Sequence, residues 1–453
     1  MSSKLLDFQP ANARECICPP AYERSSEAGP PRLKVLIGAY ACSPARGSEA
    51  GVGWGWVEAI SKHHDLWIIT GAHFKDEIEA ELEARPELRA RMRFYFVPRH
   101  RYERLEKVWP PAYLHTYQRQ WLKAEYEVAK RLQKEVGFDV VHRLTYIGFR
   151  VPGDLWRLDA PFVWGPIGGL EQTTWRLLPA LGLRGCLYYI ARNLLNDWDR
   201  RFKRSPKLAF AKAGGGIIAA TEGIRRQIKR FYGLDSTVVS EIGLPPIVRL
   251  APVEKRPSDP LRLIWCGNHL AGKALPFLLD ALEQLPPDFQ WRLTVVGDGP
   301  LTGRWKRLAI RKGLNGGIDW LGRVSREKAL QEMQSAHALI ITSVYDLTST
   351  VLVEALANGL PVVCPDHCGF ADAITNDCGI KVPATSKNEI VSGIRDAFVL
   401  LNDESFRLRL AQGALSRSRD YEWDTKGRIA NEIYRSKHLV SMKSKAAVWE
   451  CAQ

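Results

Sequence analysis

Short apolar runs alternate with amphipathic segments along most of the chain. In the first half these runs predict strands over Leu33–Gly38, Asp65–Thr70, Met92–Val97, Phe138–His142, Pro161–Gly165 and Gly216–Ala220. Segments with helical spacing lie between them, for example Lys75–Ala84 and Leu122–Val136. Strands that alternate with helices in this way predict a parallel sheet with helices on both faces.

The second half repeats the pattern. Strands are predicted over Leu261–Cys266, Arg292–Gly297, Trp320–Gly322, Ala338–Thr342 and Pro361–Cys364. Helices are predicted over Ala274–Leu285, Val351–Asn358, Lys387–Leu401, Glu404–Ser418 and Thr425–Ser436. Because 453 residues exceed the usual size of one domain, we expect two.

The predicted fold class is α/β, with two doubly wound Rossmann-like domains facing across a cleft. Ligands of such domains bind at the carboxyl ends of the strands. The expected boundaries are a disordered tail (1–32), a first domain (33–246), a linker (247–260), a second domain (261–424), a C-terminal helix (425–440) and a loose tail (441–453).

The stretch Ser343–Pro365 reads strand end, loop, helix and strand. Gly359 follows the helix as a stop signal, and Ser349 and Thr350 offer hydroxyls that could cap its start. A loop that leads into a helix N-terminus is suited to holding a phosphate. Asp346 and Glu354 could approach one bound ligand from the loop and the helix. The alternative is a capped helix in an ordinary α/β domain.

A glycine-rich loop, AYACSPARGSEAGVGWGW, follows the first predicted strand. Glycines there would let backbone amides approach a ligand, and a helix beginning near Gly51 would direct its positive end at it. The spacing is not G-x-G-x-x-G, so it gives no support for a nicotinamide or flavin cofactor.

The formal net charge of +14 indicates an acidic partner. Nucleic acid, anionic lipid head groups and phosphorylated small molecules all qualify, and charge kept for solubility is the alternative. Nucleic acid has the least support, because the chain carries no helix-turn-helix, zinc-finger or RNA-binding signature.

The composition, 45% hydrophobic and 25% charged, is typical of a soluble globular protein. The sequence has no apolar run of the ~20 residues that cross a bilayer, and its start lacks a secretory signal. Its nine cysteines show no paired zinc spacing. We therefore expect a cytoplasmic protein.

Four segments together resemble the retaining glycosyltransferases of family 4, which have the GT-B fold. They are GSEAGVGW, WCGNHLAGKAL, VVGDGP and DLTSTVLVEALANGLPVVCPDHCGFADAI. The resemblance covers roughly Leu33–Ser436. It implies an acceptor-side first domain, a second domain that binds a nucleotide sugar, and a reaction with no cofactor, metal or protein nucleophile.

The resemblance also implies roles for particular residues. Lys273 would bind the diphosphate, Glu354 the ribose hydroxyls and Asp346 the hydroxyls of the donor sugar. Further contacts to the donor would come from loop amides near Thr348, Ser349 and Thr350 and from Gly51 and Gly53. The positive charge would lie where negative charge develops on the leaving diphosphate.

The chain departs from the family pattern at three places. Asp346 stands where the family usually has glutamate, which should alter sugar contacts without inactivating the protein. The family's phosphate-binding arginine falls near Asn268, where His269 would only partly replace the charge. The histidine that many members place after the fifth strand is absent, and His142 is the nearest candidate. The alternative for His142 is a capped, hydrogen-bonded histidine at a strand end.

Two other signals have simpler explanations. Asp197-Trp198-Asp199 imitates a metal-binding Asp-x-Asp motif, but it lies within a predicted basic helix, so salt-bridged surface is the better interpretation. Cys364, Cys368 and Cys378 lack the ligands of a metal cluster, so no metal site is expected.

Two segments, LYYIARNLLNDWDRRFKR and Val108–Lys123, are rich in aromatic and basic residues. Such a face could rest on anionic lipid or bind a polyprenyl diphosphate acceptor. Plain packing of a long helix is the alternative.

We therefore expect a retaining enzyme that moves a hexose from a UDP- or GDP-sugar to a lipid-linked or glycan acceptor in polysaccharide or cell-envelope biosynthesis. Its partners would be the nucleotide sugar, the acceptor and an anionic membrane at the inner face of the plasma membrane. The alternatives are a nucleotide-sugar 2-epimerase of the same fold and an inactive nucleotide-sugar-binding module.

Overall fold

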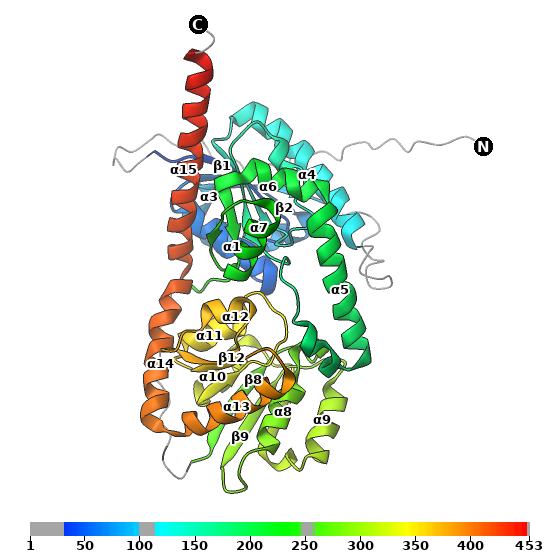
Figure 1. Ribbon diagram of the computed structural model, residues 1–453. Coiled ribbons are helices and arrows are strands. Elements are labelled where there is room, and N and C mark those ends of the chain that lie inside the picture. The colour runs from blue at the N-terminus through cyan, green and yellow to red at the C-terminus, as the bar shows by residue number, and fades with distance from the viewer. Residues whose placement is uncertain (1–30, 99–113, 246–255, 257–258, 451–453) are drawn as a thin grey trace, which may run out of the picture. The chain divides into compact units, whose positions relative to one another are not determined.

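The computed structural model describes residues 31–98, 114–245, 256 and 259–450 (Figure 1). Most of the expected N-terminal tail and linker, and residues 108–113 of one aromatic and basic segment, lie outside these ranges. Among the described residues, no helix combines the length and hydrophobicity needed to cross a bilayer.

Two parallel sheets organise the fold. The first has the order β3-β2-β1-β4-β5-β6-β7, with β1 Lys34–Ala39, β2 Asp65–Gly71, β3 Met92–Val97, β4 Val140–Thr145, β5 Phe162–Ile167, β6 Ile217–Ala219 and β7 Thr237–Val238. The second has the order β10-β9-β8-β11-β12-β13, with β8 Leu261–Cys266, β9 Trp291–Val296, β10 Ile318–Gly322, β11 Ala338–Ile340, β12 Val362–Pro365 and β13 Gly379–Val382. The predicted pair of doubly wound α/β sheets is confirmed.

Helices connect most of the strands. They are α1 Ser48–Ser61, α2 Lys75–Ala84, α3 Pro86–Arg89, α4 Leu114–Val136, α5 Gly182–Phe202, α6 Arg204–Ala213, α7 Glu222–Tyr232, α8 Leu275–Glu283, α9 Thr302–Arg311, α10 Arg326–Ser335, α11 Thr350–Ala357, α12 Cys368–Ala373, α13 Lys387–Asn402, α14 Glu404–Ser418 and α15 Trp423–Glu450.

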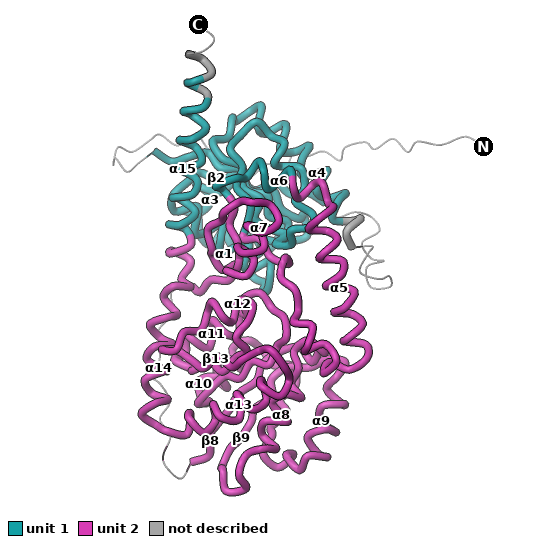
Figure 2. The backbone as a smooth tube through the Cα atoms, viewed as in Figure 1, with its two compact units in different colours: residues 1–165, 208–216, 427–453 teal, residues 166–207, 217–426 magenta. Residues whose placement is uncertain are grey.

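The chain divides into two compact units (Figure 2). Unit 1 contains residues 1–165, 208–216 and 427–453, and unit 2 contains residues 166–207 and 217–426. Neither unit is a single continuous segment of the chain.

The strand order of the second sheet places a topological switch point between β8 and β11. From β8 the chain winds outward through β9 and β10, and from β11 it winds the other way through β12 and β13. In open parallel sheets the ligand binds outside the carboxyl ends of the strands at such a switch point. The loops after β8 and β11 are therefore the natural site in unit 2.

A dense core supports this sheet in unit 2. Leu263 and Trp265 of β8 belong to the same buried cluster as Phe277 of α8 and Phe398 of α13. The cluster fixes where β8 ends. Gly359 has a φ of 65° just after α11, so the predicted glycine stop is confirmed.

Several element boundaries differ from the expectation. The helix α1 begins at Ser48, before Gly51, and α15 continues to Glu450 through residues expected to form a tail. The strands β7 and β13 were not predicted, because Thr237–Val238 is too short to show a pattern and Lys381 interrupts the apolar run of β13.

Candidate functional site

An ion pair occupies the switch point of the second sheet. Lys273 ends a short 3-10 helix (Ala271–Lys273) in the connection after β8, and Asp346 lies in the loop after β11. The Lys273 Nζ donates to Asp346 Oδ2 at 2.5 Å, and each side chain is 28% exposed. A partly exposed cation at this position can meet an anionic ligand.

Buried hydrogen bonds fix the backbone beneath this lysine. The Trp265 indole donates to the Thr342 hydroxyl at 3.0 Å, and that hydroxyl donates to the Lys273 carbonyl at 2.6 Å. Because Trp265 is in the core, the fold itself determines where the Lys273 side chain begins.

The N-terminus of α11 lies beside Asp346 in the sequence and keeps unsatisfied donors. Ser349 is the N-cap residue, yet its hydroxyl makes no capping hydrogen bond, contrary to the expectation from sequence. Within the described part of the chain, the N–H groups of Thr350 and Val351 have no acceptor. An uncapped helix start with its positive dipole end is suited to a phosphate oxygen.

A second segment of unit 2 supports the loop before α11. The Thr348 N–H donates to Glu241 Oε1 at 2.9 Å, and the Ser240 hydroxyl donates to Thr348 Oγ1 at 3.0 Å. Behind them the buried Lys426 ammonium donates to the Ser240 carbonyl at 2.7 Å. Burial raises the pKa of Glu241 and lowers that of Lys426, each to about 7. Sequence reasoning missed this support.

Glu354 lies in the interior of α11 and is paired. Its Oε1 accepts a hydrogen bond from Arg326 Nε at 2.7 Å, and the Arg326 side chain is 60% exposed. Arg326 begins α10, after β10. Nothing in the sequence singled out Arg326, because only the folded chain brings these two residues together.

Asn268 and His269 have contrasting environments. Asn268 is exposed, whereas His269 is buried and contacts the rings of Trp265, Trp305 and Trp320. His269 Nδ1 lies 2.7 Å from the Thr302 hydroxyl. Burial lowers the pKa of His269, so this side chain adds no positive charge near pH 7. A contact of either residue with phosphate stays a prediction.

Gly51 and Gly53 are helical residues of unit 1 rather than loop residues. A Cβ on Gly53 would lie 2.0 Å from the Ala41 carbonyl oxygen, and one on Gly51 would lie 2.4 Å from that of Arg46. The two glycines therefore let α1 pack against the loop that precedes it. Their contact with a ligand stays a prediction.

His142 is buried in unit 1 with both ring nitrogens bonded. Nε2 lies 2.7 Å from the Gly165 carbonyl oxygen and Nδ1 lies 2.5 Å from the Tyr434 hydroxyl. Burial lowers the pKa of His142 to about 4. β4 continues to Thr145, so His142 lies inside the strand rather than at its end. Because both ring nitrogens are bonded, His142 is not used in the site proposed below, and its contact with a ligand stays a prediction.

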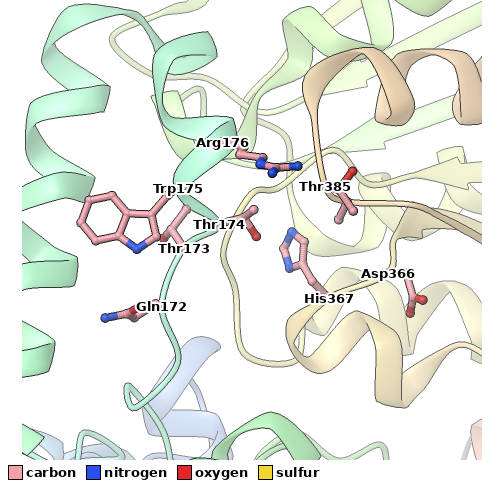
Figure 3. Close-up of a pocket in the computed structure, with 9 residues that line it drawn as sticks. Gln172, Thr173, Thr174, Trp175, Arg176, Asp366, His367 and Thr385 are labelled. Carbon is pink, nitrogen blue, oxygen red and sulfur yellow. The ribbon is translucent and has the colours of Figure 1, made fainter.

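A separate pocket of about 550 Å³ lies at the carboxyl ends of β12 and β13 in unit 2. Arg176 and Thr385 face the His367 ring across it, while Trp175 points away from that ring (Figure 3). Burial lowers the pKa of His367 to about 4. None of the residues predicted from the sequence lines this pocket.

Asp197 and Asp199 lie on α5 in ion pairs. Asp197 pairs with Arg200 and Arg201, and Asp199 pairs with Lys203 at 3.2 Å. This agrees with the salt-bridged interpretation of the motif. Among the described residues, no three His, Cys, Asp or Glu side chains are grouped so that they could hold a metal ion.

Comparisons with known proteins point in one direction. Residues 249–417 match the family model of the glycosyl transferases group 1. The chain is 24% identical over 179 residues to the uncharacterized glycosyltransferase MJ1607 of Methanocaldococcus jannaschii, covering 39% of this chain and 45% of that protein. It is 29% identical over 170 residues to a Campylobacter jejuni enzyme named GalNAc-alpha-(1->4)-GalNAc-alpha-(1->3)-diNAcBac-PP-undecaprenol alpha-1,4-N-acetyl-D-galactosaminyltransferase, covering 35% of this chain and 44% of the enzyme.

The fold also matches that of solved structures. Anabaena Alr3699/HepE in complex with UDP superposes with a TM-score of 0.56 at 15% identity, covering 89% of this chain and all of that one. The chain spans less than half the length of the two curated relatives named above. The matched segment contains Lys273, Asp346 and Glu354, and the matches support a transferase. Residues 249–417 are thus similar to the glycosyl transferases group 1, within a chain that has the GT-B fold.

Proposed function

We propose that the protein is a retaining glycosyltransferase that moves a hexose from a UDP- or GDP-sugar to a lipid-linked or glycan acceptor. The observation that carries this proposal is the Lys273 ammonium at the switch point of the second sheet. The loop after β11, which holds its partner Asp346, leads into the uncapped start of α11. Together they supply a cation and free N–H donors for a diphosphate. The Anabaena structure of similar fold holds UDP, which is consistent with such a donor.

In the proposed mechanism Lys273 stabilises the negative charge that develops on the leaving diphosphate. The acceptor hydroxyl attacks the anomeric carbon from the side that the diphosphate leaves, and its proton passes to the departing phosphate oxygen. Asp346 orients Lys273 and receives hydrogen bonds from sugar hydroxyls. Glu354, held by Arg326, binds the ribose hydroxyls. No step uses a metal or cofactor.

The proposed acceptor is a lipid-linked saccharide for a polysaccharide or a cell-envelope glycan. The Campylobacter relative is named for an undecaprenyl diphosphate-linked substrate, which supports this class. Such acceptors are embedded in a membrane, so the protein would work as a peripheral protein at the inner face of the plasma membrane.

A transfer assay tests the proposal. The whole protein is incubated with UDP- or GDP-hexoses and a lipid extract. The release of UDP or GDP is measured, and the anomeric configuration of the product is determined. Acceptor-dependent release with retention is expected, and Lys273→Ala should reduce it about 100-fold. Lys130→Ala, which removes a partly exposed lysine paired with Glu127 in unit 1, is the control.

Two other outcomes of this assay would contradict the proposal. An epimerised nucleotide sugar without acceptor would indicate the epimerase alternative. Nucleotide binding without release, for every acceptor fraction, would indicate a binding module.

A further inference from the structure

The helix α5 turns an apolar face to solvent. Seven large side chains on it are between 57% and 78% exposed: Leu183, Leu187, Tyr188, Leu194, Leu195, Trp198 and Phe202. Together with the exposed Ala191 they are linked by steps of three, four or seven residues, which places them along one side of the helix. The helix, labelled in Figure 1, is roughly 30 Å long at 1.5 Å per residue. The other exposed residues of α5 are Ala191, Arg184 and Arg201, so this face, called the α5 face below, carries no acidic residue.

The opposite side of α5 is polar and buried. Asn193 exchanges two hydrogen bonds with the Thr173 backbone, at 3.0 and 2.8 Å. Asn196 donates to the Gly169 carbonyl at 2.9 Å, and Arg200 donates to the Leu170 carbonyl at 3.0 Å. The helix is thus held to unit 2 by its polar residues. Packing of the protein core therefore does not explain the α5 face, which is the alternative that the sequence left open.

The buried side of α5 also touches the candidate site. A Cβ on Gly272, next to Lys273, would lie 1.9 Å from the Tyr189 hydroxyl. The Arg192 guanidinium lies 3.7 Å from the ring centroid of Tyr345, next to Asp346. The α5 face is therefore separated from the loops of the candidate site by about one helix diameter, ~10–12 Å.

The charges of α5 favour an anionic surface over a second copy of the chain. Arg184 and Arg201 lie on the α5 face, and Lys203, Arg204 and Lys207 follow it. If two copies paired through this face about its centre, antiparallel packing would bring Arg184 near the other copy's Arg201, and parallel packing would bring each arginine near its counterpart. Both arrangements would place positive side chains against each other, in chains that each carry a net charge of +14. The repulsion disfavours a dimer through this face.

We propose that the α5 face is the surface by which this protein binds an anionic phospholipid bilayer. The apolar side chains insert among the acyl chains near the head groups, and the flanking arginine and lysine residues bind lipid phosphates. The assignment rests on the proposed function in one respect: a lipid-linked acceptor would then be presented close to the loops that hold Lys273 and Asp346.

Vesicle co-sedimentation tests the proposal on the whole protein. Vesicles of phosphatidylcholine with about 30 mol % phosphatidylglycerol should bind it, and pure phosphatidylcholine should bind it at least about fivefold less. The double substitution Leu194→Ser/Leu195→Ser should reduce binding to the mixed vesicles about tenfold. Arg184→Glu/Arg201→Glu should abolish the preference for phosphatidylglycerol.

A second exposed apolar group supplies the control. Leu439 and Val440 of α15 are 58% and 60% exposed, and Leu439→Ser/Val440→Ser should bind vesicles like the unmodified protein. All substituted residues are at the surface, so every variant should unfold within about 2 °C of the parent.

Three results would overturn the proposal. They are vesicle binding that the α5 substitutions leave unchanged, loss of binding in the α15 control instead, or an α5-dependent dimer with no vesicle binding. Stabilisation by UDP-sugars is measured in parallel, because it depends on the proposed function alone. Vesicle binding without a nucleotide response would refute the proposed function but not the membrane surface. A nucleotide response without vesicle binding would refute the membrane surface but not the proposed function.

Discussion

In the Lys273–Asp346 ion pair, the carboxylate holds the lysine ammonium in place before a ligand binds. Asp346 holds the ammonium at 2.5 Å, and the Leu347 N–H donates to its second oxygen at 3.1 Å. A ligand that replaced the carboxylate would find Lys273 already placed. We therefore expect Asp346 to position Lys273, in addition to the sugar contact that the resemblance implies.

That role predicts opposite results for two substitutions. Asp346→Asn removes the charge that positions Lys273 and should lower kcat/KM for the donor by about tenfold to 100-fold. Asp346→Glu keeps the charge and supplies the residue usual in the family, so it should stay within about threefold of the parent. Steady-state kinetics with the best donor measures both. Equal losses for the two variants would contradict the positioning role.

The buried His142 should make the free energy of unfolding depend on pH. Its pKa is about 4 in the folded chain and about 6.5 in the unfolded chain, so the unfolded state gains a proton first as the pH falls. The contribution of His142 is full above pH 6.5 and is lost toward pH 4, on the order of 3 kcal/mol. Urea unfolding of the parent should show this loss between pH 7 and pH 4, and in His142→Gln the loss should be smaller by about that amount, since His64 and His367 still contribute. The same pH dependence in both proteins would refute the assignment.

At the level of helices and strands, α1 packs closely against the loop that precedes it because Gly53 has no side chain. Gly53→Ala would place a Cβ 2.0 Å from the Ala41 carbonyl oxygen, a backbone atom that cannot rotate away. We expect a net destabilisation of about 1–3 kcal/mol, despite the better helix propensity of alanine. In α9, a Cβ on Gly303 would meet nothing within 4 Å, so Gly303→Ala should be neutral or slightly stabilising. Thermal unfolding compares them, and a Gly53→Ala variant as stable as the parent would contradict the packing account.

Elements are also where the sequence was most and least informative. Periodicity predicted β3, β8, α2 and α14 at their observed bounds, because each is long and regular or strongly apolar. The same periodicity could not say which side of α5 is buried. Its apolar side is exposed, since Asn193, Asn196 and Arg200 satisfy backbone groups of residues 169–173.

The candidate site was predictable in part for a related reason. Lys273 and Asp346 follow neighbouring strands in a wound sheet, so strand order alone brings them together. Arg326 and Glu241 contact Glu354 and Thr348 through side chains 28 and 107 positions away, and no local pattern encodes such pairs. His142 was a candidate because a strand-end histidine has the same sequence signal whether it is catalytic or buried.

At the scale of the whole molecule, two parallel sheets provide two switch points, and the chemistry proposed here concentrates at the second. The segment 249–417, which matches the glycosyl transferases group 1, contains β8 to α13 together with Lys273, Arg326, Asp346 and Glu354. The α5 face, the proposed membrane surface, lies on a helix of the same unit that packs against the connection carrying Lys273.

Titration calorimetry of UDP and GDP measures the proposed diphosphate site itself, with the whole protein in buffer that contains EDTA. We expect that at least one nucleotide binds, that Lys273→Ala weakens its affinity about tenfold or more, equal to ~1.4 kcal/mol, and that Lys130→Ala binds like the parent. Equal affinity in Lys273→Ala and the parent, or binding that EDTA abolishes, would contradict a site in which this lysine and the start of α11 hold the diphosphate without a metal.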